Sequence, residues 1–252
     1  MKRAGRPILF CLTVSLLLIA AGCVTNSATK FAYISGGPVS GVAAETSLPL
    51  RVAVRPFQDL RGTNKVDHKL LALVPLVPYG TITYDRPEHT GTRPSFTFYP
   101  AEDFPRAVVD ELRLNGFFRE VIYDAGADER DVDLIVSGSV TTTRYVHKDL
   151  SYGLSLLTML PEMRGLVSSA GLPTEIYEYA ISFTVEARRA SDDIVVWSHV
   201  VEGSQWKFVG AYYGGGQYED FAILLRQGLR SAMESLANEI RTRELSYWKG
   251  GL

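Results

Sequence analysis

Cysteine and histidine are the side chains of this sequence best suited to metal binding and nucleophilic chemistry. The chain has two cysteines and four histidines. The histidines stand far apart, at positions 68, 89, 147 and 199, so no pair has the i, i+4 spacing that places two imidazoles on one helical face. No GxSxG motif marks a nucleophilic serine. Residues distant in sequence can still meet in space, but the pattern predicts no metal, no cofactor and no catalytic residue, and we expect a protein that is not an enzyme.

The glycine-rich stretch YYGGGQYED at 212–220 is the best candidate for a phosphate-binding loop, because such turns before a helix N-terminus bind anions. It has no GK[ST] sequence, and Glu219 and Asp220 fall in the first turn of the helix that follows. Their carboxylates complement the helix dipole and would repel a phosphate. We therefore interpret the stretch as an aromatic contact loop, with Tyr212 and Tyr213 as candidate partner contacts, since tyrosine is enriched at interfaces.

The N-terminus has the three-part order of a secretory signal. A basic start at residues 2–6 precedes an apolar run at 8–20, and three small residues stand directly before Cys23. The apolar run is too short for an ordinary membrane-spanning helix. We predict that residues 1–22 are a signal peptide.

The residues Ala20-Ala21-Gly22-Cys23 resemble the lipobox of bacterial lipoproteins, with alanine where leucine is commoner at the first position. The resemblance implies cleavage before Cys23 and attachment of a diacylglycerol group, with palmitate, to its sulfur. Cys23 would then be a lipidation site that holds the protein on membrane lipid. Val24, in place of aspartate, points to the bacterial outer membrane rather than the inner membrane. The alternative is a plain signal peptide with a chance cysteine.

Cysteine content and net charge exclude further classes of site and partner. Cys11 would leave with the signal and Cys23 would be acylated, so no thiol remains for a disulfide or a thiolate metal site. The formal net charge of −2 argues against a general nucleic-acid binder, which needs a basic face. We expect partners to be membrane lipid and envelope protein, with no nucleic acid, and an oligomer is compatible with the sequence.

The rest of the chain divides into a linker and a domain. Residues 24–48 are rich in Gly, Ser, Thr and Ala, so we predict a lipidated flexible tether over 23–48. We predict a single α/β periplasmic domain over 49–252. Within it, proline-rich residues 58–100 and apolar residues 148–174 are expected to form long loops.

Hydrophobic periodicity predicts the elements of that domain. Helix 103–115 should start at a capping Asp103 and end at Asn115-Gly116, and Gly228 should let the last helix approach a sheet closely. The expected strands are 50–57, 119–124, 132–147 and a hairpin over 175–208, and the last helix is 218–244. The order β-α-β-β-β-β-α predicts an α/β (α+β) sandwich, in which two main helices pack on one face of a mixed sheet of about five strands.

Three segments in this order, VAVRPFQDLRG, VVDELRLNGFFREV and VDLIVSGSV, are similar to a bacterial envelope group. The group comprises the curli-secretion lipoprotein, the lipoprotein activators of penicillin-binding proteins and the N-terminal domain of the Tol-system periplasmic protein. The resemblance covers about residues 50–245. It implies a non-enzymatic lipoprotein that binds a partner or belongs to a pore.

Two apolar, proline-broken segments, LLALVPLVPYG at 70–80 and the run at 150–173, are the candidate contact surfaces. The eleven-residue, mostly apolar stretch at 150–160 is too short to span a bilayer as a helix. The second segment is therefore a buried helix or lid, a docking surface for a protein, or a shallow membrane contact. Its candidate contact residues are Leu154, Leu156, Leu157, Met159 and Leu160. We expect the two segments to lie side by side.

The strands of the 175–208 hairpin are long enough to cross a membrane, which takes about 9–11 residues. One half-buried sheet of a soluble domain explains the same alternation. The sequence thus favours an acylated outer-membrane lipoprotein on the periplasmic face, acting as a non-enzymatic accessory or adapter in envelope assembly or transport. The alternative is a subunit of an oligomeric outer-membrane secretion pore. A hydrolase is a distant third and would need a converging Ser/His/Asp cluster.

Overall fold

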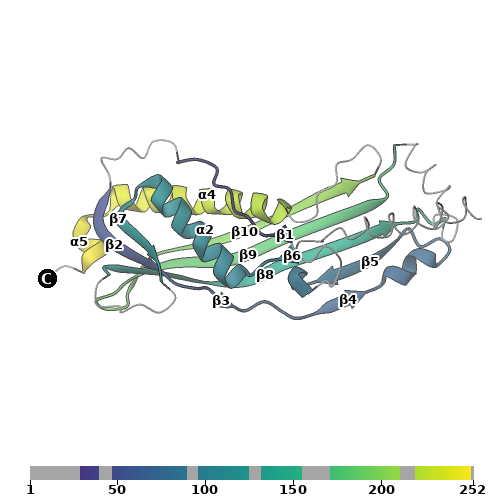
Figure 1. Cartoon of the computed structure of the whole chain (residues 1–252), viewed down its shortest axis with the longest axis horizontal. Coiled ribbons are helices and arrows are strands. Elements are labelled where there is room, and N and C mark those ends of the chain that lie inside the picture. The colour runs from purple at the N-terminus through teal and green to yellow at the C-terminus, as the bar shows by residue number, and fades with distance from the viewer. Residues whose placement is uncertain are drawn as a thin grey trace, which may run out of the picture.

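The molecule, seen in a computed structural model, is elongated along three long strands (Figure 1). The structure describes residues 29–39, 47–89, 96–124, 132–154, 171–210 and 219–250. The long strands are β8 (Leu134–Leu150), β9 (Glu175–Arg189) and β10 (Val195–Val209), and they pair antiparallel in the order β8-β9-β10. The predicted hairpin over 175–208 is therefore confirmed almost to the residue.

Alternation along β9 shows why this hairpin forms. Every second side chain from Tyr177 to Ala187 is buried, while the residues between them are partly exposed. A period of two places one face of a strand on the core and the other toward water. Tyr179 lies on the inner face, because its ring contacts that of Phe221 in the C-terminal helix, with centroids 5.2 Å apart. The inner face is thus the helix-covered face of the sheet.

One end of the sheet, which we call the base, contains the five predicted strands. β2 (Leu48–Val54) lies between β7 (Phe118–Tyr123) and β8 and is parallel to both. The strand order is β10-β9-β8-β2-β7. The helix α2 (Pro100–Asn115) connects β2 to β7, as the predicted parallel crossover requires.

The other end, which we call the tip, corrects the predicted strand number from about five to eight. One edge of β8 pairs in succession with β2, with β3 (Gln58–Asp59) and with β5 (Tyr79–Tyr84), and β4 (Lys65–Asp67) pairs with β5. Without β5, the far end of β8 would present an unpaired edge, which natural sheets avoid. The prediction that 58–100 is one long loop is therefore wrong.

Short elements also lie within residues 58–100. They are the 3₁₀ helices η2 (Lys69–Leu73) and η3 (Pro87–His89) and the strand β6 (Phe96–Thr97). The second predicted loop, 148–174, is shorter than expected, because β8 continues to Leu150 and β9 begins at Glu175. Of that loop, 151–154 and 171–174 lie within the described residues.

Helix α2 begins three residues earlier than predicted. Its N-cap is Tyr99, whose backbone N–H donates to Asp103 Oδ2 at 2.7 Å, so Asp103 caps from inside the first turn. Pro100 opens the helix, where its missing N–H costs nothing. Gly116 ends it in the left-handed conformation, with φ of 63°, as predicted.

The helix α4 (Glu219–Thr242) packs on β10 and β9, and it contacts α2 on the same face. A Cβ on Gly228 would lie 2.1 Å from Val201 Cγ1, which confirms that glycine allows this close approach. A short helix, α5 (Leu245–Lys249), follows and buries Trp248. Two main helices on one face of a mixed sheet confirm the predicted layers. Among the described helices, none is both long and apolar enough to cross a bilayer.

Part of the predicted tether belongs to the domain. β1 (Thr29–Lys30) pairs in parallel with β6, and the ring of Phe31 lies 4.9 Å from that of Phe98. The backbone N–H of Val39 donates to Asn115 Oδ1 at 2.7 Å. Phe31 and Val39 are both buried in the core. The predicted flexible tether over 23–48 is therefore corrected for residues 31–39, because Phe31 and Val39 in this segment pack into the core of the domain.

Candidate functional site

Of the contact residues proposed from sequence, Leu154 lies within the described residues. Cys23, Leu156, Leu157, Met159, Leu160, Tyr212 and Tyr213 lie outside the described residues. Leu154 is described, and its side chain is 44% exposed. Exposure of Leu154 is consistent with a contact surface and argues that the segment is not buried at this point.

The two apolar segments predicted to lie together do so where both are described. Tyr79 pairs with Leu150 across β5 and β8. Beyond the strand ends, the N–H of Ser151 donates to the carbonyl of Pro78 at 2.8 Å, and that of Leu76 donates to the carbonyl of Gly153 at 3.2 Å. Backbone hydrogen bonds therefore fasten the start of one segment to the end of the other, and the predicted adjacency is confirmed for these residues.

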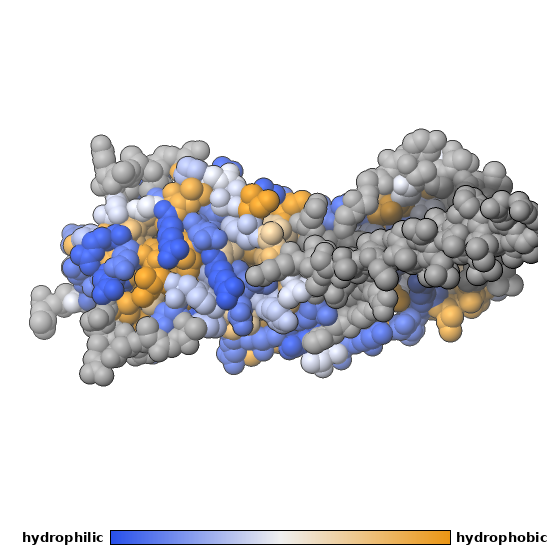
Figure 2. Space-filling view, in the orientation of Figure 1, coloured by the Kyte–Doolittle hydropathy of each residue, from blue (hydrophilic) through white to orange (hydrophobic). Residues whose placement is uncertain are grey.

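Exposed apolar side chains gather at this junction. We call them the apolar tip, and they are Leu70, Leu71, Val74, Leu76, Tyr79, Tyr152 and Leu154. None of the residues of η2 is buried, and Asp67, His68 and Lys69 join Leu70, Leu71 and Val74 around a shallow hollow. Figure 2 shows hydrophobic side chains at the surface near this end of the molecule. Contiguous exposed apolar surface of this kind marks interaction sites in soluble domains.

Backbone conformation at the apolar tip is unusual. Leu76 has φ of 67° and Tyr152 has φ of 52°, in the left-handed region that bulky residues rarely adopt. Leu76 is nevertheless 89% exposed, so its side chain gains little from packing. Residues held in such conformations cluster at binding sites, where the surrounding structure fixes them.

The outer face of the sheet continues the apolar surface. Trp206 and Phe208 are about half exposed there, on the face that turns away from α4. Lys148 Nζ lies 4.9 Å from the ring centroid of Trp206 and 5.8 Å from that of Tyr79. At this end of the molecule the long strands extend beyond both main helices (Figure 1).

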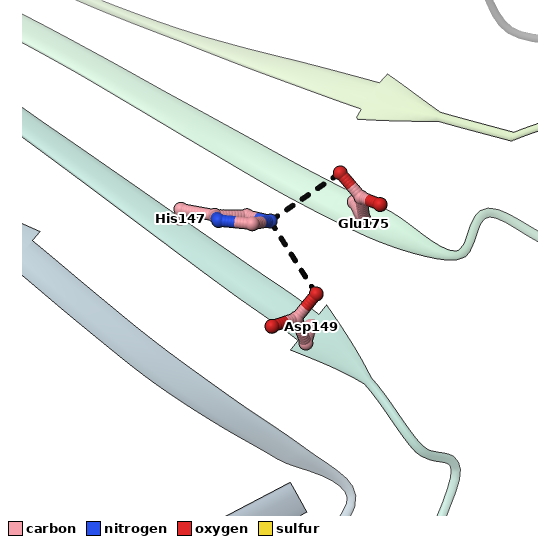
Figure 3. Close-up of side chains that lie close together, drawn as sticks. All are labelled: His147, Asp149 and Glu175. Carbon is pink, nitrogen blue, oxygen red and sulfur yellow. Dashed lines mark ion pairs between the residues drawn. The ribbon is translucent and has the colours of Figure 1, made fainter. Parts of the chain in front are cut away.

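On the inner face of the same end, three metal-ligating side chains converge, which we call the His-carboxylate cluster: His147, Asp149 and Glu175. Asp149 pairs with Glu175 across β8 and β9, and His147 precedes Asp149 by two residues on the same face. His147 Nε2 lies 3.3 Å from Glu175 Oε2 and 3.5 Å from Asp149 Oδ1 (Figure 3). The ligand atoms of all three lie within 4.8 Å of one another.

Neighbouring groups hold the cluster in place. The Tyr177 hydroxyl donates to the Glu175 carboxylate, and the rings of Tyr177 and His147 have centroids 4.7 Å apart. Lys69 Nζ, from η2, lies 3.3 Å from Asp149 Oδ2. Two carboxylates directly opposite in an antiparallel pair repel each other, so a cation between or beside them stabilises the arrangement. The cluster can therefore bind a proton, an ammonium group or a metal ion.

Sequence reasoning missed this cluster because it considered helical histidine spacing. The usable signal was His-Asp at i, i+2 in a strand, which places both side chains on one face. Glu175 lies beside them only because of the register between β8 and β9, and this register cannot be read from the sequence. The expectation of no metal site thus rested on separation along the chain and not on position in the sheet.

A second polar group, around Arg61, has a structural role. The Arg61 side chain is 3% exposed and donates to Asp59 at 2.9 Å, to Glu88 at 2.7 Å and to the Thr143 hydroxyl at 2.7 Å. Hydrogen bonds from Arg61 lower the pKa of the Asp59 carboxyl. Burial would lower the pKa of Arg61, but the bonds to Asp59 and Glu88 raise it. Every donor and acceptor here has a partner, so the group fixes β3 against β8.

A serine–histidine contact bears on the hydrolase hypothesis. His199 Nε2 on β10 lies 3.4 Å from Ser231 Oγ on α4. Partial burial lowers the pKa of His199. Across the described parts of the chain, no ion pair joins His199 to a carboxylate, which is the third group that orients the base of a catalytic triad. The contact carries no catalytic proposal.

Comparison with solved structures finds distant likenesses. XCC0632 of Xanthomonas campestris, a DUF330 protein, matches with a TM-score of 0.43 and 10% identity, over 84% of this chain and 92% of its own. A PelC dodecamer of Paraburkholderia phytofirmans gives 0.37 and 13%, over 80% of this chain and 95% of that one. Lipoprotein GNA1162 of Neisseria meningitidis gives 0.25 and 14%, over 75% and 99%. No protein-family model and no curated protein sequence matches the chain. At these values the likenesses decide neither family nor function.

Proposed function

We propose that the protein is a lipid-anchored protein of the bacterial envelope that acts as a non-enzymatic accessory or adapter, with a protein partner docked on the apolar tip. The observation that supports it is the exposed apolar surface at one end of the sheet, where Leu70, Leu71 and Leu76 are exposed and lie outside the described core cluster. The signal sequence and Cys23 supply the anchor.

The charges around the apolar tip favour a protein over a lipid surface as its partner. Lys69 is paired with Asp149, and Lys148 is 3.9 Å from Glu178. Binding to an anionic bilayer needs an excess of basic residues, whereas this end carries both signs. Aromatic side chains surrounded by paired charges are typical of protein interfaces.

The packing of residues 31–39 bears on how the anchor would hold the domain. If Cys23 is acylated, six peptide units separate it from Thr29, where β1 begins. Six residues span at most about 20 Å. The start of β1, and with it the domain, would therefore stay close to the bilayer.

A pore subunit remains the second candidate, and β10 is the observation that favours it. Among the described strands, β10 pairs with β9 alone, so it is an edge strand of the described sheet, and a strand of another chain could extend the sheet there. The full chain in mild detergent would form a ring-sized oligomer and conduct ions in planar bilayers if this function holds. A monomer without conductance supports the adapter.

Photo-crosslinking tests the adapter directly. A photoreactive amino acid is placed at Leu71, 46% exposed at the tip, and at Leu114, 42% exposed on α2 at the base, in the bacterium that encodes the protein. We expect one specific envelope protein to be captured from Leu71 and not from Leu114. Capture from both positions, or from neither, would contradict docking at the tip.

Lipidation is tested separately, because the anchor and the docking surface are independent. Radiolabelled palmitate should enter the full chain and should not enter the Cys23→Ala variant. Labelling of the alanine variant would show that Cys23 is not the acceptor. In that case the envelope location would rest on the signal sequence alone.

A further inference from the structure

The His-carboxylate cluster goes beyond the adapter function, and its geometry points to a site for one divalent transition metal ion, for which we infer zinc as the best fit. The ligands would be His147 Nε2, one oxygen of Asp149 and one oxygen of Glu175. One imidazole and two carboxylates are a donor set that zinc accepts in protein sites. Three protein ligands leave a fourth position for water or a group of a partner.

The distances distinguish a metal from a proton. Zinc bonds of about 2.0–2.1 Å in a tetrahedron place neighbouring ligand atoms about 3.3–3.4 Å apart. The two separations from His147 Nε2 are 3.3 Å and 3.5 Å. A charged N–H···O hydrogen bond would bring the same atoms to about 2.7–2.9 Å. These two separations suit ligands around an ion better than a hydrogen bond, and all three ligand atoms lie within 4.8 Å of one another.

The state of His147 agrees with this assignment. Its Nε2 is buried and, among the residues the structure describes, has no hydrogen-bond partner of good geometry. Its near neighbours are the two carboxylate oxygens. A buried nitrogen without a hydrogen bond is costly, and coordination to a metal would satisfy it.

The groups behind the ligands are those a metal site needs. Tyr177 is 3% exposed, and its hydroxyl binds the Glu175 carboxylate and so fixes its orientation. The Tyr177 ring also packs against the His147 ring. Partners of this kind orient metal ligands and raise affinity. Among the described residues, Lys69 is a competing cation at the cluster, and its side chain is more than half exposed.

A metal ion bound at the cluster would affect the segments next to it. Asp149 lies at the end of β8 and Glu175 at the start of β9, so an ion would join the two ends of the connection over 151–174. Its binding to Asp149 would also compete with Lys69 of η2, which carries part of the apolar tip. Metal binding would thus act on the segments that form the docking surface.

Isothermal titration of the untagged full chain in detergent with zinc chloride, after chelation and dialysis, tests the inference. We expect saturation at one equivalent. His147→Ala and Glu175→Gln should each weaken binding by more than about 100-fold, and Tyr177→Phe by about 10-fold. The matched control is Glu178→Gln, the same change on the same strand with its side chain on the outer face, paired with Arg144; it should leave affinity unchanged.

A measurement on the wild-type chain tests the site independently of whether the variants fold. Cobalt chloride should give the visible absorption of tetrahedral Co²⁺, saturating at one equivalent and removed by zinc. Absence of saturable zinc binding and of the cobalt absorption would overturn the inference. So would zinc binding that both His147→Ala and Glu175→Gln retain while circular dichroism shows them folded.

Discussion

The base and the tip of this sheet are built from the same three strands but have opposite surfaces. At the base, α2 and α4 cover the inner face, and Phe183 of β9 is fully buried between Phe57 and Phe104. At the tip, the outer face of the sheet turns away from α4, and Phe208 of β10 is 45% exposed there. Strand formation requires only alternation, whereas burial requires a covering element. The uncovered outer face at the tip is therefore accessible for binding, and the helix-covered inner face at the base supplies the stability.

The largest effect expected from this contrast is on global stability. Phe183→Ala should lower the free energy of unfolding by about 3–5 kcal/mol, because it empties a packed site in the core. Phe208→Ala removes the same side chain from an exposed position and should cost less than about 1 kcal/mol. Urea titration followed by circular dichroism measures both. Equal losses for the two variants would show that the tip is also a stabilising core.

A slightly smaller loss is expected where the two regions join. Arg61→Leu leaves the Asp59 and Glu88 carboxylates without their shared cation and should cost about 3 kcal/mol. Arg106→Leu removes an exposed arginine paired with Glu102 on α2 and should cost less than about 1 kcal/mol. Chemical unfolding at neutral pH measures both variants. A loss below about 1 kcal/mol for Arg61→Leu would show that the buried ion group is dispensable.

The same group makes a pH prediction. The pKa of Asp59 is lower in the folded chain than its ordinary 3.8, so the unfolded state binds more protons as pH falls below that value. This stabilisation is complete above the ordinary aspartate range and is lost as pH falls through the lowered pKa. Arg61→Leu should therefore flatten the acid side of the stability curve. An unchanged acid slope would count against Arg61 as the cause.

At the apolar tip, a substitution should separate stability from binding. Leu76→Gly relieves a left-handed backbone and should raise the free energy of unfolding by up to about 1 kcal/mol. It also removes the most exposed apolar side chain, so partner capture by the crosslinker at Leu71 should fall several-fold. The control, Leu114→Gly within α2, should lower stability by about 1 kcal/mol and leave capture unchanged. A Leu76→Gly variant with full capture would remove Leu76 from the docking surface.

The smallest effect concerns His199, near α4. Partial burial lowers its pKa below the ordinary 6.5, so the unfolded state binds more protons between those two values. The unfolding free energy should consequently decrease slightly as pH falls through 6.5, and His199→Asn should remove that decrease. Urea midpoints at about pH 7.5 and about pH 5.5 measure it. Identical midpoint shifts in both proteins would exclude His199.

The elements of the base were predictable because each carries a local signal. Alternation from Tyr177 to Ala187 specifies β9, and Asn115-Gly116 specifies the end of α2. The tip was not predictable in this way. The strand β5 is a six-residue segment between prolines, and its pairing with β8 depends on the length by which β8 overhangs β2. That length is a property of the assembled sheet.

Of the two candidate sites, one was predictable from local sequence and the other was not. The adjacency of residues 76–79 and 150–154 was predicted from their shared apolar, proline-broken character and is confirmed by their hydrogen bonds. The His-carboxylate cluster was missed, since Glu175 stands 26 residues beyond Asp149 in the chain and meets it only through strand register. Lipidation at Cys23 stays a prediction from sequence.

The sequence by itself determined the signal pattern before Cys23, the order of the two main helices and of the five strands of the base, and which face of β9 is buried, because these depend on neighbouring residues and on short periods. Only the tertiary structure decided that β8 has three successive partners on one edge, that residues 31–39 complete the core, and that His147, Asp149 and Glu175 converge. Each of these depends on contacts between residues far apart in the chain. Such contacts depend on strand register and on how far one strand extends beyond its neighbour, and no local sequence pattern specifies either of these.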